Sequence, residues 1–217
     1  MESDGHEDGR LERGRRTREA VLDSAVALAS VHGLEGLTFG RLAEHLGMSK
    51  SGLFAHWKDK ERLQLDAIGR ARRQWTARVM EPALRTPPGL RRVLALHDAR
   101  LAFYADGTLS GGCFFLAAQT EFDDRPGAVR ARLAESLRDW LAFVRSLLEE
   151  AVALGELPDH LDTGQLAYEI DALGESAVVH ARLVGPEVTY PRARRAVLDR
   201  LRALATDPAA LPEDPPC

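Results

Sequence analysis

Apolar residues along this chain recur at the three- and four-residue intervals that are typical of α-helices. Glycine and proline divide the pattern into separate elements. Gly33 and Gly47 suit helix C-termini, and we expect Pro82 to end a fourth helix that opens at Asp59. No alternation of β-branched and polar residues indicates a strand. The pattern therefore predicts an all-α fold.

The same periodicity continues through the second half of the chain. It predicts helices at about 90–104 and 113–122, a long helix that restarts near Pro126 and stops before Pro158, and two more at about 162–184 and 191–205. The first 14 residues are dominated by charge and the last 12 by Pro, Asp and Ala. We expect 1–14 to be a disordered arm and 206–217 a disordered tail.

Charge is distributed unevenly between the two halves of the chain. The formal net charge is −4, yet 10–73 carries 13 Lys and Arg against 8 Asp and Glu, while 74–217 carries 16 against 21. All three lysines, Lys50, Lys58 and Lys60, fall in one short window. Such asymmetry indicates a local polyanion-binding face, although an ordinary charged surface can fluctuate this much.

Composition favours a cytoplasmic protein without a membrane anchor. The two cysteines, Cys113 and Cys217, form no disulfide framework, which suits a reducing compartment. The longest uncharged run, 107–120, is shorter than the ~18 residues of a membrane span. The N-terminus has no apolar stretch and does not read as a signal peptide.

The most informative stretch runs from Thr38 to Lys60. Two short helices, opened by the potential N-caps Thr38 and Ser49, meet at a three-residue turn that contains Gly47, as in a helix-turn-helix. A small core between them is expected from the spacing of Phe39, Leu42, Leu46, Met48, Leu53 and Trp57. The outer face of the second helix is polar and suits a DNA major groove. That face carries Ser49, Lys50, Ser51 and Gly52.

This stretch resembles the TetR (tetracycline-repressor-like) family. The family pattern is a helix ending in Gly, a helix opened by Thr and closed by Gly, then Leu-Tyr/Phe-x-His/Tyr-Phe and Lys-x-Lys-Glu-x-Leu. The matching residues here are Gly33, Thr38, Gly47, Leu53-Phe54-Ala55-His56-Trp57 and Lys58-Asp59-Lys60-Glu61-Arg62-Leu63. About forty residues match by motif. The resemblance implies a DNA-binding transcriptional regulator with an N-terminal three-helix domain and a C-terminal helical domain.

The resemblance also implies a role for individual residues. Phosphate contacts are implied for Thr38, Phe54, His56 and Lys60, and base-edge contacts for Arg41, Ser49, Lys50 and Ser51. Gly52 departs from the family pattern, which often has threonine there, and this puts the operator sequence in doubt. Phe54 can instead be a core residue, and His56 can cap or pair locally. The basic run Arg10, Arg13, Arg15, Arg16 and Arg18 is either a DNA-binding arm or a solvated charge run.

We expect 15–60 to form the DNA-binding domain and 61–205 a ligand-binding and dimerisation domain. Inward polar residues of the second domain are candidates for an effector pocket, although each can be an ordinary packing residue. These candidates are His97, Tyr104, Cys113, Gln119, Trp140, Tyr168 and Asp171. Cys113 is either a redox sensor or, more simply, a buried cysteine.

The function that this predicts is a repressor, released from a palindromic operator by an unknown small molecule. The last two helices carry the small residues Ala167, Gly174, Ala177 and Ala181 and are expected to form a homodimer. No catalytic motif, metal-ligand spacing or cofactor loop is present, so we expect neither an enzyme nor a cofactor. A regulator without a small ligand, or an activator of transcription, stays open.

Overall fold

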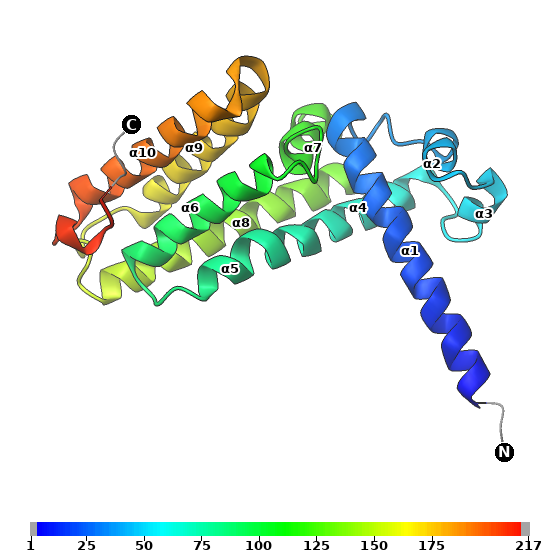
Figure 1. Ribbon diagram of the computed structural model, residues 1–217, viewed down its shortest axis with the longest axis horizontal. Helices are drawn as coiled ribbons and strands as arrows, with labels where there is room; N and C mark the ends of the chain where they lie inside the picture. The colour runs from blue at the N-terminus through cyan, green and yellow to red at the C-terminus, as the bar shows by residue number, and fades with distance from the viewer. Residues whose placement is uncertain (1–3, 214–217) are drawn as a thin grey trace. The chain divides into compact units, whose positions relative to one another are not determined.

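The computed structural model describes residues 4–213, with side chains from Gly14 onward. Every regular element in that range is a helix (Figure 1). The all-α prediction is therefore confirmed. None of these helices combines the length and apolarity that a membrane span needs.

The helices form two compact units. The first contains the described residues up to Arg73 together with Leu109–Leu133, and the second contains Gln74–Thr108 and the described residues from Ala134 onward. Helices α4 (Lys60–Trp75) and α8 (Ala128–Ala153) each contribute to both units.

The first unit is built around α1 (Asp4–His32). Helices α2 (Phe39–Leu46), α3 (Lys50–Phe54) and α7 (Phe114–Phe122) complete it with most of α4. Helix α7 packs on α1, beside which it lies in Figure 1. One face of α1 is buried, and its apolar residues repeat at helical spacing: Val21, Leu22, Ala25, Val26 and Ala29.

The second unit begins with the π-helical turn η1 (Thr76–Met80) and the short α5 (Glu81–Leu84). Helices α6 (Leu90–Ala105), α9 (Thr163–Val184) and α10 (Pro186–Leu204) pack together, with α9 and α10 side by side (Figure 1). The 3₁₀ turn η2 (Pro208–Ala210) follows.

Pro82 does not end the fourth helix, contrary to our expectation. The chain continues through η1 into α5, and the Glu81 N–H donates to the Thr76 carbonyl five residues earlier. A wider π turn placed directly before Pro82 accommodates a residue that has no N–H of its own. The helical path therefore ends only at Leu84, ahead of Pro87.

The described residues near each end of the chain include helix or tertiary contacts. Helix α1 extends back to Asp4, because Glu and Arg are good helix formers and a helix already held by packing lengthens at little cost. In the tail, Leu211 is buried, and the Arg91 Nε donates to the Ala210 carbonyl at 2.6 Å. Residues 1–3 and 214–217, including Cys217, lie outside the described part.

Three boundaries also differ from the predictions. Helix α8 begins at Ala128, after Pro126, and α10 begins at Pro186, with Pro191 inside it. The predicted division at 60/61 is not where the packing divides the chain. Most of helix α4 belongs to the first unit, where the Gln64 Nε2 donates to the Leu34 carbonyl and Arg70 pairs with Asp23.

Candidate nucleic-acid interface

Local capping interactions set the geometry of the helix-turn-helix. Thr38 accepts a hydrogen bond from the Arg41 N–H and opens α2, and Ser49 accepts one from the Gly52 N–H and opens α3, both at 3.2 Å. Gly47 closes α2 with φ of 61°, a left-handed conformation that glycine adopts without strain. The caps predicted from the sequence are confirmed.

A small core holds the two helices together. Leu42, Leu53 and Trp57 are fully buried, as predicted. The other expected members, Phe39, Leu46 and Met48, are half-buried. The core therefore depends mainly on the three fully enclosed side chains.

Trp57 is also anchored by polar contacts that the sequence did not reveal. Its Nε1 donates to Asp66 Oδ2 at 2.9 Å, and the same oxygen accepts from Arg18 Nη2 at 2.5 Å. The Arg18 guanidinium lies over the Trp57 ring at 4.5 Å and donates to the His56 carbonyl at 2.9 Å. Arg18 thus joins α1 to the end of the helix-turn-helix and is not a free member of a basic arm.

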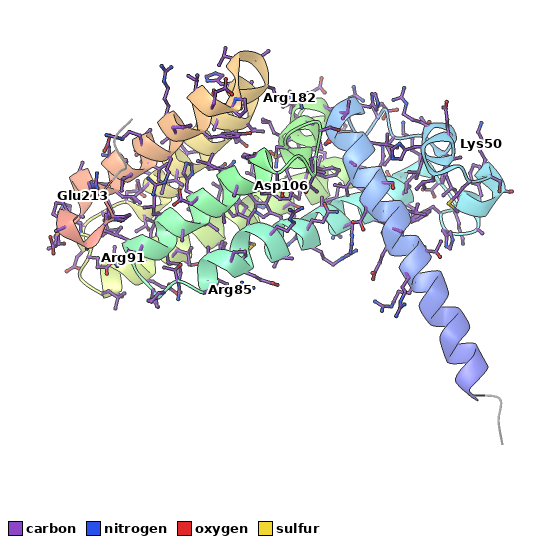
Figure 2. All side chains as sticks on the ribbon, viewed as in Figure 1. Lys50, Arg85, Arg91, Asp106, Arg182 and Glu213 are labelled. Carbon is purple, nitrogen blue, oxygen red and sulfur yellow. The ribbon has the colours of Figure 1, made fainter. Side chains whose placement is uncertain are left out.

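The side chains expected to face base edges are exposed. Lys50, labelled in Figure 2, lies at the start of α3. Its side chain passes close to Gly40 of α2, since a Cβ added to Gly40 would lie 3.3 Å from Lys50 Cε. The Arg41 Nη1 donates to the Gly36 carbonyl at 3.1 Å. Ser49 and Ser51 share a hydrogen bond of 3.0 Å. These bonds leave further donors on the Arg41 guanidinium, and hydrogen-bonding capacity on the serine hydroxyls, for contacts with bases.

The residues expected at phosphates lie in different environments. Thr38 is exposed, although its hydroxyl already caps α2. The Phe54 side chain is 51% exposed and stacks on Phe39 with ring centroids 4.3 Å apart, so it is not a core residue. His56 is half-buried, with its ring centroid 5.5 Å from that of Trp57.

Lys60 is held by the loop before α2. Its Nζ lies 2.6 Å from the Glu35 carbonyl oxygen and 2.5 Å from Glu35 Oε1. The hydrogen bond from Lys60 is the main cause that lowers the pKa of the Glu35 carboxyl. This pair is partly exposed, so a phosphate group could compete with Glu35 for the ammonium.

The backbone conformation at position 52 does not require glycine. Its φ lies outside the positive range, and an added Cβ would meet its nearest neighbour, Ser49 Oγ, at 3.4 Å. A side chain at this position therefore fits, and glycine leaves the outer face of α3 open.

In the second unit, Arg100 brings three predicted pocket residues together. Its Nε donates to the Tyr104 hydroxyl at 2.8 Å, and its Nη1 lies 2.8 Å from Asp171 Oδ1. The Trp140 Nε1 donates to the same carboxylate oxygen at 2.8 Å. Arg100 was absent from the sequence prediction, yet its spacing from His97 and Tyr104 places it on the same inward face of α6.

His97 is buried on α6, as predicted, and is 2% exposed. Neither ring nitrogen makes a hydrogen bond of regular geometry, although the backbone of Ala193 lies near enough to favour the protonated form. Burial lowers the pKa of His97 to about 3, the charge of Arg100 adds to this shift, and the backbone of Ala193 opposes it only in part. The imidazole is therefore neutral at pH 7.

The remaining pocket candidates lie elsewhere. Cys113 and Gln119 belong to the first unit, where buried Cys113 opens α7 by accepting from the Leu116 N–H at 3.5 Å. Tyr168 is 62% exposed on α9 and lines no interior space of this chain. Asp171, three residues further along α9, is buried, so the spacing of the two residues did not by itself distinguish the buried position from the exposed one.

Comparisons with known proteins agree with this architecture. Residues 21–67 match the family model described as bacterial regulatory proteins of the tetR family, and residues 89–197 match a tetracyclin repressor-like C-terminal domain. The chain is 24% identical over 166 residues to the HTH-type transcriptional repressor ComR of Escherichia coli K12, covering 76% of this chain and 79% of ComR.

Two further relatives show which parts are shared. A 54-residue stretch is 48% identical to the Escherichia coli class C tetracycline repressor protein, covering 25% of this chain and only 24% of that repressor. A TetR transcriptional regulator from Chloroflexus aurantiacus has a similar structure, with a TM-score of 0.82 and 26% identity over 89% of this chain and 98% of that one. The chain belongs to the TetR family of DNA-binding transcriptional regulators, which are not enzymes.

Proposed function

We propose that this regulator is a repressor that binds a palindromic operator as a homodimer and leaves it when a small molecule binds the second unit. The main support for DNA recognition is the exposed polar face of α3. On this face Lys50 and Ser51 lie near the exposed ring of Phe54. Repression is the activity named for the similar ComR protein.

An apolar surface on α9 and the start of α10 supports the dimer. Monomeric proteins seldom leave several large apolar side chains exposed together. Here the exposed residues recur on successive turns of α9 and continue into α10: Val179, Leu183, Val184 and Val188. A second copy of the same surface would cover them in a two-fold dimer.

Selection of bound duplexes from random DNA tests the proposal with the full chain. We expect a two-fold symmetric consensus whose half-site centres lie roughly 34–36 Å apart, one DNA turn. Lys50→Ala should weaken binding and relax the preference at one base position in each half-site. Duplexes recovered without any consensus at low ionic strength would contradict the proposal.

A further inference from the structure

The Arg100 guanidinium is enclosed by aromatic rings inside the second unit. Its Cζ lies 5.8 Å from the Trp75 ring centroid, 5.7 Å from that of Tyr104 and 5.6 Å from that of Trp140. The Arg100 side chain is only 4% exposed. Cations within about 6 Å of aromatic faces are attracted by the ring quadrupoles, and several rings around one point form a cage for organic cations.

Two carboxyl groups lie on α9 beside this cage of three rings, Trp75, Tyr104 and Trp140. Asp171 accepts from Arg100 and from Trp140, so its carboxylate is fixed in place. Glu175 lies one turn further along α9 and is half-buried, and its pKa is raised by burial and by the Asp171 charge. Two carboxyl groups therefore share the positive charge of one arginine, which makes the site electrostatically suited to cations.

Gly174 provides the space that the guanidinium fills. A Cβ at this position would lie 2.4 Å from Arg100 Cζ. Arg100 reaches the cage through a long, flexible stem, whereas Asp171 has a short side chain anchored by two donors. Arg100 is itself held by the Tyr104 hydroxyl and by the side chain and carbonyl of Asp171, so a ligand that takes its position must replace these bonds. A buried ion pair of this kind adds little net stability over an apolar pair of the same volume, but removing one partner alone is strongly destabilising. Arg100 can therefore leave only when another cation takes its place beside Asp171.

We propose that this cage, formed by Trp75, Tyr104, Trp140 and Asp171, is the effector site and that the effector is an organic cation. Its ammonium or guanidinium group takes the place of the Arg100 guanidinium against Asp171, and an apolar body contacts the rings. Trp75, Trp140 and Glu175 are half-buried, so part of each of these residues reaches solvent. An anionic effector would have to displace the anchored Asp171 instead. The inference rests on the proposed ligand response and names its chemical class.

Direct titration of the full-length wild-type protein tests this assignment. The cationic probes are phenylguanidine and benzyltrimethylammonium, with neutral benzyl alcohol and anionic benzoate as matched compounds. Two of the three tryptophans line the cage, so intrinsic fluorescence reports occupancy and calorimetry gives the Kd. We expect the cations to bind with Kd below about 1 mM and at least tenfold more tightly than the other two compounds.

Carboxylate-to-amide variants locate the binding. Asp171→Asn should weaken cation binding at least tenfold, and Glu175→Gln, at a half-buried position that can change without loss of the fold, should weaken it in the same direction. The control is Glu149→Gln, which breaks an exposed pair with Arg145 on α8. Equal binding of benzoate or benzyl alcohol, no binding of either cation, or unchanged affinity in both cage variants overturns the assignment.

Operator binding is measured in the same samples. Saturating cation should lower operator affinity at least fivefold, the lower end of typical allosteric coupling. If the protein binds the operator but neither cation, the assignment of the cage as an effector site is wrong, while the proposed DNA-binding function is unaffected. Absent operator binding in the wild type would refute the proposed function, whatever the cations do.

Discussion

Lys60 Nζ is bound twice by one residue, Glu35, through its carboxylate at 2.5 Å and its backbone carbonyl at 2.6 Å. The resemblance to the TetR family implies that Lys60 contacts a DNA phosphate. In the free protein, however, its ammonium group is already hydrogen-bonded to Glu35. A DNA phosphate would take over an ammonium that Glu35 already positions, and Glu35 would then stand close to the polyanion.

Lys60→Gln should weaken operator binding about equally for all duplex sequences, because a phosphate contact carries no sequence information. The slope of log K against log salt concentration should become shallower by about 1 per protomer. Fluorescence anisotropy over a salt series measures both quantities. Arg145→Gln, on α8, removes the same charge far from α3 in sequence and should leave the slope unchanged.

Gly52→Ala should stabilise the protein by about 0.5–1 kcal/mol, since alanine is the better helix former and its Cβ finds room beside Ser49. Gly47→Ala is the matched control, with the same change at a φ of 61°. It should destabilise by about 1 kcal/mol. Urea denaturation followed by circular dichroism gives both values. Equal effects at the two positions would contradict this account of α3.

Gly174→Ala should destabilise the protein by about 2 kcal/mol, because the new methyl group pushes Arg100 away from Asp171 and disturbs a buried pair. In an Arg100→Ala background the clash is absent. The same change should then be neutral or stabilise by up to about 1 kcal/mol, the helix-propensity gain. A double-mutant cycle in urea measures this reversal of sign. Additive effects of the two substitutions would show that glycine is not needed at position 174 to make room for Arg100.

His97→Leu should make the protein less sensitive to acid. The pKa of His97 is depressed to about 3 in the folded state, so the unfolded chain takes up this proton first as the pH falls below ~6.5. Above that pH the protonation of His97 does not lower the free energy of unfolding of the wild type. Between about pH 6.5 and pH 3 it lowers this free energy by up to about 1.4 kcal/mol per pH unit. Urea titrations of both proteins between pH 7 and pH 4 should diverge accordingly. Parallel curves would show that His97 has a partner when folded.

Leu183→Glu should convert the proposed dimer into a monomer. Leu183 is 78% exposed on α9, so the folded protomer loses no internal packing, while a carboxylate at a two-fold contact faces its own copy. Light scattering coupled to size-exclusion chromatography measures the mass. His160→Glu, at an exposed position outside α9 and α10, is the control. A dimer that survives the change would place the interface elsewhere.

Local rules explain why much of the DNA-binding region could be predicted. Thr38, Gly47 and Ser49 satisfy backbone groups within a few residues of themselves, so their roles are readable from short segments. The apolar stripe of α1 and the burial of Trp57 follow equally from periodicity and size.

The features that could not be predicted depend on partners distant in the sequence. Arg18 meets Asp66 across 48 positions and Arg100 meets Asp171 across 71, and nothing in the local pattern pairs them. The tail was predicted from composition alone, and the contact between Arg91 and Ala210, 119 positions apart, is what orders it. Charged residues on otherwise apolar faces are thus the signal to search for such partners.

The π turn at Thr76–Met80 has a consequence for engineering this chain. A turn of this kind contains one residue more than an α-helical turn, so deleting a single residue there would leave a continuous α-helix of the usual geometry. Because the wide turn and an α-helical turn each complete about one revolution, the residues between the deletion and Leu84 would keep nearly the same direction relative to Trp75. This turn is therefore the place on the path where one residue can be lost without a change of phase, whereas each further deletion would rotate the following residues by about 100°.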